Sequence, residues 1–281
     1  MRIAMMLMRH PPTKVSPIMP EVVALLSDWG VSVQEIYPEE GLFDLDAVDV
    51  ENDLYILKSG TDAALSLAGA LEAAGARVLN PYSVAATLRD KIIATRIQQL
   101  AGIPTPKTYV TGCTGDLSPR LLGGPLIVKP YRGSQGRGIR VVRDEEELCS
   151  VETAECPVFA QRYHEPNGND LKIYCIGGQV FGVRRPWPAL TYADKVGEPF
   201  AISSTLHEVA LAWGRAFGID LFGIDVIECQ DGFYVVDGSS FPGFKGVPDA
   251  ALRLADYIYA AGLRAKNGEH STSAAHAEAV I

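Results

Sequence analysis

Two aspartates set into apolar segments are the residues of this sequence that most clearly suggest chemistry. The apolar stretches on either side of Gln230-Asp231-Gly232 are typical of a β-hairpin with glycine in the left-handed position. A three-residue loop would pair residue 229 with residue 233, and therefore Asp225 with Asp237. Because side chains alternate between the faces of a strand, Asp225, Asp237 and Ser239 would share one face.

Two opposed carboxylates repel each other, and a divalent cation between them removes that penalty. Hard oxygen ligands favour Mg²⁺ or Mn²⁺ over zinc. The hairpin therefore predicts Asp225, Asp237 and Ser239 as ligands of Mg²⁺ or Mn²⁺. The alternative is a pair of solvated aspartates at strand ends, and the rest of the chain has to decide between the two interpretations.

A lysine precedes a glycine-rich segment in the middle of the chain. Lys129 ends the apolar stretch that begins at Pro125, and Gly133-Ser-Gln-Gly136-Arg-Gly follows it. This order differs from a Walker loop, in which the lysine follows the glycines and a helix begins. A strand-loop-strand arrangement predicts a flap in which Ser134 and backbone N–H groups such as that of Gly136 cover a polyphosphate. A mobile hairpin tip is the alternative, but an unpaired ammonium in an apolar strand is costly, so Lys129 indicates an anionic ligand.

A second hairpin is predicted around Gly177-Gly178, whose two-residue turn pairs residue 176 with 179. Residue 172 then pairs with 183 and residue 170 with 185, so Asp170, Lys172 and Arg185 share a face. Asp170 either neutralises the two cations in a structural cluster, or the cations form a wall for an acceptor or for ATP phosphates.

Several other polar residues lie at the ends of predicted elements. Lys58 follows a strand, and His10 and Lys14 lie in the loop after the first strand, where open α/β sheets bind ligands. Lys91 begins a helix. Gln161 and Tyr163 end a strand before a loop, a suitable hinge for a flat ligand such as adenine. Each of these residues alone has a plain alternative as a solvated side chain.

Bulk composition restricts the classes of protein. The 281 residues are 47% hydrophobic and 21% charged, which is ordinary for a globular protein. The formal net charge of −9 and a pI near 5.1 argue against nucleic-acid or anionic-membrane partners bound through the overall field. Five scattered cysteines without metal-like spacing, and no signal peptide or membrane span, predict a cytoplasmic protein. The oligomeric state is left open.

The first hundred residues alternate strand and helix signals, which predicts an α/β domain with a parallel sheet. Strands are expected at 3–8, 31–36, 54–57 and 77–79, and helices at 20–29, 61–74 and 90–101. Beyond the prolines at 104 and 106, strand pairs dominate and predict α+β modules. We place strands at 108–110, 126–129, 139–142, 158–162, 171–176 and 179–185, and helices from 144, at 206–217 and at 248–261.

These patterns predict four parts. They are an N-terminal α/β domain (1–102), a central subdomain with the glycine-rich flap (103–168), a C-terminal subdomain with the metal site (169–264) and a flexible tail (265–281).

Taken in order, these residues resemble the ATP-grasp superfamily from about residue 1 to 262. The resemblance implies an ATP-grasp fold in which two α+β subdomains clasp ATP, with Mg²⁺ or Mn²⁺ as the metal. It implies that Lys91 and Lys129 bind phosphates, that Gln161 and Tyr163 form the adenine hinge, and that Asp225, Asp237 and Ser239 bind the metal. At position 239 the family pattern has asparagine instead of serine. We also group Ser134, Gly136 and Asp170 with the nucleotide-binding residues.

Two branches of the superfamily compete. The flap and Leu88-Arg-Asp-Lys91 are similar to RimK-type glutamate ligases. The segments around Lys58, Lys172, Arg185, Asp225 and Phe241 resemble inositol trisphosphate 5/6-kinases, in which the first three face the inositol phosphate. The histidine that such kinases carry in the flap is absent here.

The leading hypothesis is Mg-ATP-dependent phosphoryl transfer to a small anionic acceptor, with Lys129, Arg185 and Asp237 as catalytic residues and Lys14, Lys58, Lys172 and Arg185 on the acceptor. The alternative is a RimK-type carboxylate–amine ligase that acts through an acyl phosphate. A third hypothesis, motivated by Ser239, is an ATP-binding protein with weak catalysis.

Overall fold

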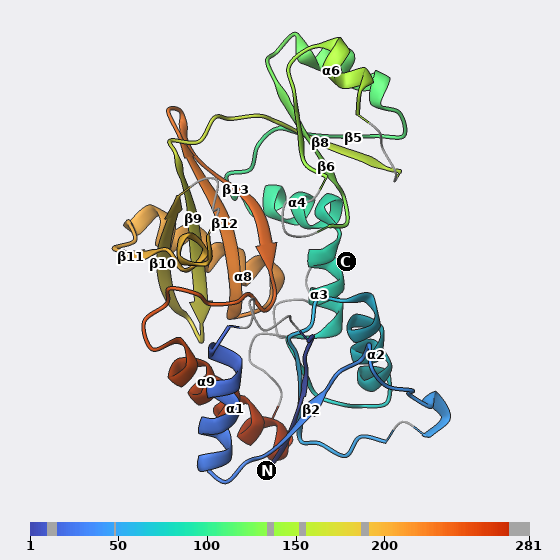
Figure 1. Ribbon diagram of the computed structural model, residues 1–281, viewed down its shortest axis with the longest axis vertical. Helices are drawn as coiled ribbons and strands as arrows, with labels where there is room; N and C mark the ends of the chain where they lie inside the picture. The colour runs from blue at the N-terminus through green and yellow to red at the C-terminus, as the bar shows by residue number, and fades with distance from the viewer. Residues whose placement is uncertain (10–15, 48, 134–137, 152–155, 187–190, 270–281) are drawn as a thin grey trace.

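Three β-sheets follow one another along the chain (Figure 1). The structure is a computed structural model that describes residues 1–9, 16–47, 49–133, 138–151, 156–186 and 191–269. In this part of the chain, no helix is both long and apolar enough to cross a membrane.

The N-terminal sheet is parallel, with strand order β2-β1-β3-β4 and helices on both faces. Ile3 and Met5 belong to the core shared with α1 and α9, whereas Ala4 and Met6 belong to the core shared with α2. Burial on both faces explains the nearly continuous apolar run of the first strand. The elements are β1 (Arg2–Met6), α1 (Ile18–Asp28), β2 (Ser32–Ile36), η2 (Leu45–Ala47), β3 (Leu54–Leu57), α2 (Asp62–Ala73), β4 (Val78–Leu79), α3 (Tyr82–Arg89), α4 (Lys91–Leu100) and, from the end of the chain, α9 (Ala250–Lys266).

The central sheet is antiparallel, with strand order β5-β8-β6-β7. Leu126, Val128 and Ala160 lie in its buried core. Because side chains alternate along a strand, the residues adjacent to these three in β6 and β8 face the other side. That other side carries Lys129 and Gln161. The elements are β5 (Thr108–Thr111), η3 (Thr114–Leu117), α5 (Ser118–Leu121), β6 (Leu126–Pro130), β7 (Arg140–Val142), α6 (Glu145–Cys149) and β8 (Val158–Arg162).

The C-terminal sheet is also antiparallel, with strand order β11-β10-β9-β12-β13. One face packs against α8, where Trp213 is fully buried among Ile173, Phe222 and Ile224. Asp170, Lys172 and Asp225, which alternate with these core residues, therefore face away from α8. The elements are β9 (Asn169–Ile176), β10 (Gln179–Pro186), α7 (Tyr192–Val196), β11 (Glu198–Phe200), α8 (Ser204–Phe217), β12 (Leu221–Cys229) and β13 (Gly232–Ser239).

The expected α/β and α+β character is confirmed, and each sheet lies within one of the three expected domains. The exact domain boundaries stay predictions. Helix α3 was not expected, because its eight residues include serine, threonine and valine and follow the Asn80-Pro81 break. It gains its stability by burying Ala85 and Leu88. Helix α9 continues to Lys266, beyond the expected start of the tail at 265, and residues 270–281 lie outside the described part of the chain.

Candidate active site

The acidic hairpin brings Asp225 and Asp237 opposite each other, as predicted, but by a different route. Its loop has two residues, since Cys229 pairs with Gly232, so the expected pairing of residue 229 with residue 233 is wrong. A β-bulge between this tip and Asp225 restores the register. Without the bulge, Asp237 would share the core-facing side with Val235; the extra residue turns its side chain to the face of Asp225.

Lys91 connects this hairpin to the glycine-rich segment. Its Nζ donates to the backbone carbonyl of Gly133 over 2.7 Å and lies 3.9 Å from Oδ2 of Asp237. Lys91 is the first residue of α4, and the Asp90 side chain caps that helix by accepting from the N–H groups of Ile92 and Ile93. The cap fixes the helix start and therefore the point from which the ammonium group extends.

Lys129 is buried, with only 9% of its surface exposed, and points to the same group of charges. Its Nζ donates to Oε1 of Gln161 over 3.0 Å, and Nε2 of Gln161 donates to the Thr108 hydroxyl over 3.1 Å. Burial lowers the pKa of Lys129, while the neighbouring Asp237 opposes that shift. Removal from solvent raises the pKa of Asp237, whereas the charges of Lys91 and Lys129 oppose that shift. The three side chains thus share one electrostatic environment.

The second hairpin has the predicted register, with Lys172 opposite Val183 and Asp170 opposite Arg185. Lys172 forms an ion pair with Asp225 and lies 3.8 Å from Oδ2 of Asp170. Although burial lowers the pKa of Lys172, the Asp225 and Asp170 carboxylates raise it above its usual value. Lys172 therefore stays charged. In the free protein its charge is paired with Asp225 and Asp170, the acids on its own face of the sheet.

Arg185 lies beside Asp170 and Lys172 but makes its own hydrogen bond. One of its terminal nitrogens donates to the Tyr174 hydroxyl, whereas its buried Nε has no hydrogen-bond partner among the described residues. A buried guanidinium nitrogen without an acceptor is costly in the free protein. An anionic ligand would supply the missing acceptor, and Arg185 is suited to bind one through two nitrogens at once.

Lys58 extends from the carboxyl end of β3, as predicted for a ligand site of an open sheet. Its Nζ donates to the Phe241 carbonyl over 3.1 Å and lies 5.3 Å from the centre of the Phe241 ring. Burial, with a further contribution from Lys245, lowers the pKa of Lys58 to about 8. Burial, and after it the charges of Arg185 and Lys195, lower the pKa of Lys245. These four cations form a region that favours an anion.

The structure thus collects the predicted residues into two connected groups. One group, predicted to bind phosphate and metal and called the metal side below, contains Lys91, Lys129, Gln161, Asp170, Lys172, Asp225 and Asp237. The other, predicted to bind the acceptor and called the acceptor side below, contains Lys58 and Arg185. Ser239 is exposed and pairs with Gly223, two positions along from the Asp225–Asp237 pair. The backbone N–H of Tyr163 donates to Pro125. His10, Lys14, Ser134 and Gly136 lie outside the described residues.

Four contributors were missed by the sequence analysis. Tyr174 follows Lys172 by two residues, so strand alternation alone could have placed it on the same face. Asp90 precedes the helix of Lys91 and has the composition of an N-cap. Lys195 and Lys245 carry no such signal, because they come from α7 and from the segment after β13, and only the tertiary fold brings Lys245 near Arg185 and Lys195.

Asp225 and Asp237 suit Mg²⁺ in the type of their ligand atoms and in lying opposite each other on paired strands. Two carboxylates on one face, together with the Ser239 hydroxyl, form a hard oxygen set to which nucleotide phosphates would add further ligands. The described residues contain no group of three His, Cys, Asp or Glu side chains that could hold a metal by themselves. Such a site would accordingly bind the metal together with a phosphate ligand.

This chain is similar in sequence to a known protein family and to individual proteins. Residues 88–259 match the model of the RimK-like ATP-grasp domain. A protein named probable alpha-L-glutamate ligase from Parasynechococcus marenigrum is 28% identical over 64% of this chain, and this chain spans 41% of that protein's length. Alpha-aminoadipate–LysW ligase LysX from Saccharolobus solfataricus is 29% identical over 78% of this chain and 85% of its own length.

A solved structure supports the fold. The D-alanine–D-alanine ligase of Bacillus anthracis aligns with a TM-score of 0.75 over 96% of this chain and 100% of its own, at 21% identity. The expected ATP-grasp architecture is therefore confirmed.

The comparisons favour the ligase interpretation, which the sequence analysis placed second, over the inositol-phosphate-like kinase that it placed first. The kinase hypothesis rested on Lys58, Lys172 and Arg185 as ligands of a phosphorylated acceptor. Cationic side chains attract carboxylates as well as phosphates, so these residues do not distinguish the two substrates. Lys172, moreover, is paired with Asp225 and Asp170.

Proposed function

Because this chain belongs to the RimK-like ATP-grasp family, we propose that it is an ATP-dependent ligase that joins the carboxylate of a small acidic substrate to an amine. The observation that carries this proposal is the position of Lys91. It contacts the glycine-rich segment on one side and Asp237 on the other, so a phosphate between these elements would meet Lys91, Lys129 and the metal-binding acids together.

Each residue then has a distinct task on the nucleotide side. Lys91 and Lys129 neutralise the phosphates of ATP, and Gln161 keeps the Lys129 ammonium in place. Asp225, Asp237 and Ser239 would hold Mg²⁺, which contributes charge neutralisation and orientation of the phosphates when bound. Lys172 reduces the repulsion between Asp225 and its acidic neighbours.

On the acceptor side, Arg185 and Lys58 bind the acidic substrate. The Nε of Arg185 has no hydrogen-bond partner among the residues that the structure describes, and burial lowers the pKa of Lys58. Both observations support binding of an anion by these groups. A substrate with more than one carboxylate could present one to this cationic region and another to the nucleotide. Lys14 is proposed for the same region from its place after β1.

The reaction consists of two transfers. A substrate carboxylate oxygen attacks the γ-phosphorus of ATP and ADP leaves, which gives an acyl phosphate. The amine then attacks the acyl carbon, inorganic phosphate leaves, and the nitrogen loses one proton as the amide forms. Charge stabilisation and alignment supply most of the catalysis in such a sequence, so no side-chain nucleophile is needed.

Hydroxylamine trapping tests the proposal. The protein is incubated with MgATP, hydroxylamine and individual dicarboxylic or amino-dicarboxylic acids, and the acyl hydroxamate is measured beside ADP. We expect hydroxamate and ADP in equal amounts with at least one acid. A stable phosphorylated product formed from a polyol, without hydroxamate from any acid, would instead establish the kinase.

Ser239 favours one further candidate function, nucleotide binding with weak turnover, because a hydroxyl is a shorter and less polar ligand than the amide of the family pattern. ADP formation that no acid stimulates, from a protein that binds MgATP, would support it. Restoration of turnover by Ser239→Asn would then identify this residue as the cause.

A further inference from the structure

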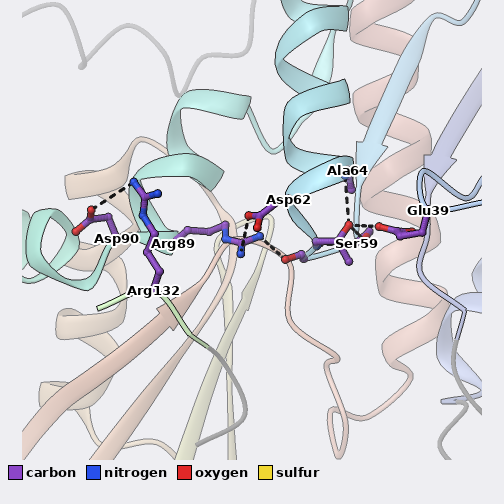
Figure 2. A network of polar contacts seen from close by, with 9 residues as sticks. Glu39, Ser59, Asp62, Ala64, Arg89, Asp90 and Arg132 are labelled. Carbon is purple, nitrogen blue, oxygen red and sulfur yellow. Dashed lines mark hydrogen bonds and ion pairs between the residues drawn. The ribbon is translucent and has the colours of Figure 1, made fainter. Parts of the chain in front are cut away.

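Three consecutive residues at the junction of α3 and α4 contact three different parts of the molecule. Arg89 ends α3 and reaches the segment after β3, Asp90 caps α4, and Lys91 reaches Asp237 of β13. Asp90 also lies 3.9 Å from a guanidinium nitrogen of Arg132, just before the glycine-rich segment (Figure 2). This junction therefore joins the N-terminal sheet, the central sheet and the metal-side hairpin.

Arg89 makes two contacts with one short loop. One terminal nitrogen donates to the Gly60 carbonyl, and the other lies 3.0 Å from Oδ1 of Asp62 (Figure 2). The ion pair alone contributes little, because 91% of the Asp62 side chain is exposed. The hydrogen bond to the Gly60 carbonyl has more effect on position, because it holds the backbone itself, two residues after Lys58.

The same loop is held from its other side by a chain of hydroxyl contacts. The Thr61 hydroxyl donates to Glu39, accepts from the N–H of Ala64 at the start of α2, and lies 3.1 Å from the Ser59 hydroxyl. The loop is thus anchored to the N-terminal domain through Thr61, and to the helix of Lys91 through Arg89.

We propose that Arg89 is a positioning residue that holds the segment Lys58–Asp62, on the acceptor side, at a fixed place relative to Lys91, on the phosphate side. The inference rests on the proposed function, because that function assigns the two lysines to the two ends of one reaction. When a bound nucleotide orders Lys91, it therefore also orders the segment Lys58–Asp62, because Arg89 connects the two.

Hydrogen exchange with a non-hydrolysable MgATP analogue tests this proposal without knowledge of the acidic substrate. We expect the analogue to slow exchange of the amides at residues 60–65 in the wild-type protein. In Arg89→Gln this protection should fall at least about tenfold, while analogue affinity changes less than about threefold. Arg89→Lys should retain part of it, because a compact ammonium keeps the charge but cannot reproduce the fork of two guanidinium nitrogens that makes the two contacts.

The matched control is Arg143→Gln, which removes another exposed arginine pair, 3.8 Å from Glu147, in the central part of the chain. It should keep the wild-type protection. Asp62→Asn provides a second variant in which only the ion pair is weakened, and it should lose less protection than Arg89→Gln. Protection at 60–65 that the wild type never gains, or that Arg89→Gln gains in full, overturns the proposal. Failure of the ligase function itself would be seen separately, as absence of hydroxamate.

Discussion

Individual charges in this site are balanced by neighbours from other elements. Asp225 has Lys172 as its ion partner, and Asp237 has Lys91 at 3.9 Å. The two acids are therefore neutralised in part before any cation binds, whereas Arg185 keeps a buried nitrogen that has no hydrogen-bond partner in the described part of the chain. This difference fits the proposed function, in which one half of the site takes a metal with phosphate and the other half takes an anion.

Replacing Asp237 tests the metal side. Asp237→Asn removes one of the two carboxylates while leaving a side chain of the same size, so kcat should fall on the order of 100-fold or more. Steady-state ADP formation at saturating MgATP measures the effect. Glu228→Gln removes an exposed charge from the same hairpin and should retain wild-type turnover. Near wild-type activity of Asp237→Asn would remove the residue from the metal site.

The pH dependence of Lys58 tests the acceptor side. Its pKa of about 8 means that the ammonium is lost as pH rises through that value, so the KM of the acidic substrate should rise there. A bound anion shifts this loss to higher pH. Lys58→Arg, which stays charged, should keep a KM that changes little across the same window. An equally steep rise in Lys58→Arg would assign the titration to another group.

The same titration of Lys58 should stabilise the fold as pH rises, whereas it weakens substrate binding. Below pH 8 the group is protonated in both the folded and the unfolded chain and contributes no slope. Between about 8 and its ordinary value of 10.5, the unfolded chain binds more protons, so the free energy of unfolding gains a rising contribution. Urea denaturation at several pH values should show that contribution in the wild type and not in Lys58→Met.

At the scale of elements, the hairpin of β12 and β13 depends on its two faces being used differently. Phe222, Ile224 and Val226 pack toward α8, and the bulge turns Asp237 to the opposite face. Gly238 lies between Asp237 and Ser239, and a Cβ there would meet a ring carbon of the buried Trp213 at 2.4 Å. The metal strand can therefore approach α8 this closely only with glycine at position 238.

Gly238→Ala should consequently destabilise the hairpin and the metal site together. Overpacking of this kind costs about 1–3 kcal/mol, since Trp213 has no space to move into. Thermal unfolding gives the loss of stability, and MgATP-analogue binding gives the effect on the site. Gly243→Ala is the matched control, because its nearest contact would be the Lys245 side chain at 3.8 Å. Equal stability of the two variants would contradict this account.

At the scale of the whole molecule, the site takes its side chains from all three parts of the chain that carry a sheet. Lys58 comes from the N-terminal sheet, Lys129 from the central sheet and Asp237 from the C-terminal sheet. Helix α9, at the C-terminal end of the described chain, packs beside α1 and completes the core of the N-terminal sheet (Figure 1). This packing fixes the acceptor side to the C-terminal subdomain, and Arg89 adds the link to the nucleotide side.

Much of this arrangement could be predicted from local sequence. The turn at Gly177-Gly178 set the register of Lys172 and Arg185, and apolar periodicity located most strands and helices. Prediction failed where packing between elements that are distant in sequence decides the local structure. Helix α3 is stabilised by burial of Ala85 and Leu88, and the bulge of the acidic hairpin compensates for a loop one residue shorter than expected.

By itself, the sequence determined the chemistry that is available: two aspartates in strands, a lysine before a glycine-rich segment, and cations at strand ends. Spacing and alternation fix which neighbouring side chains share a face, because strand geometry is local. Only the tertiary structure decided which charges meet. Lys172 pairs with Asp225 and Lys91 approaches Asp237 because packing brings separate elements together. In the proposed function, this distribution of charge separates a metal side from an anion side.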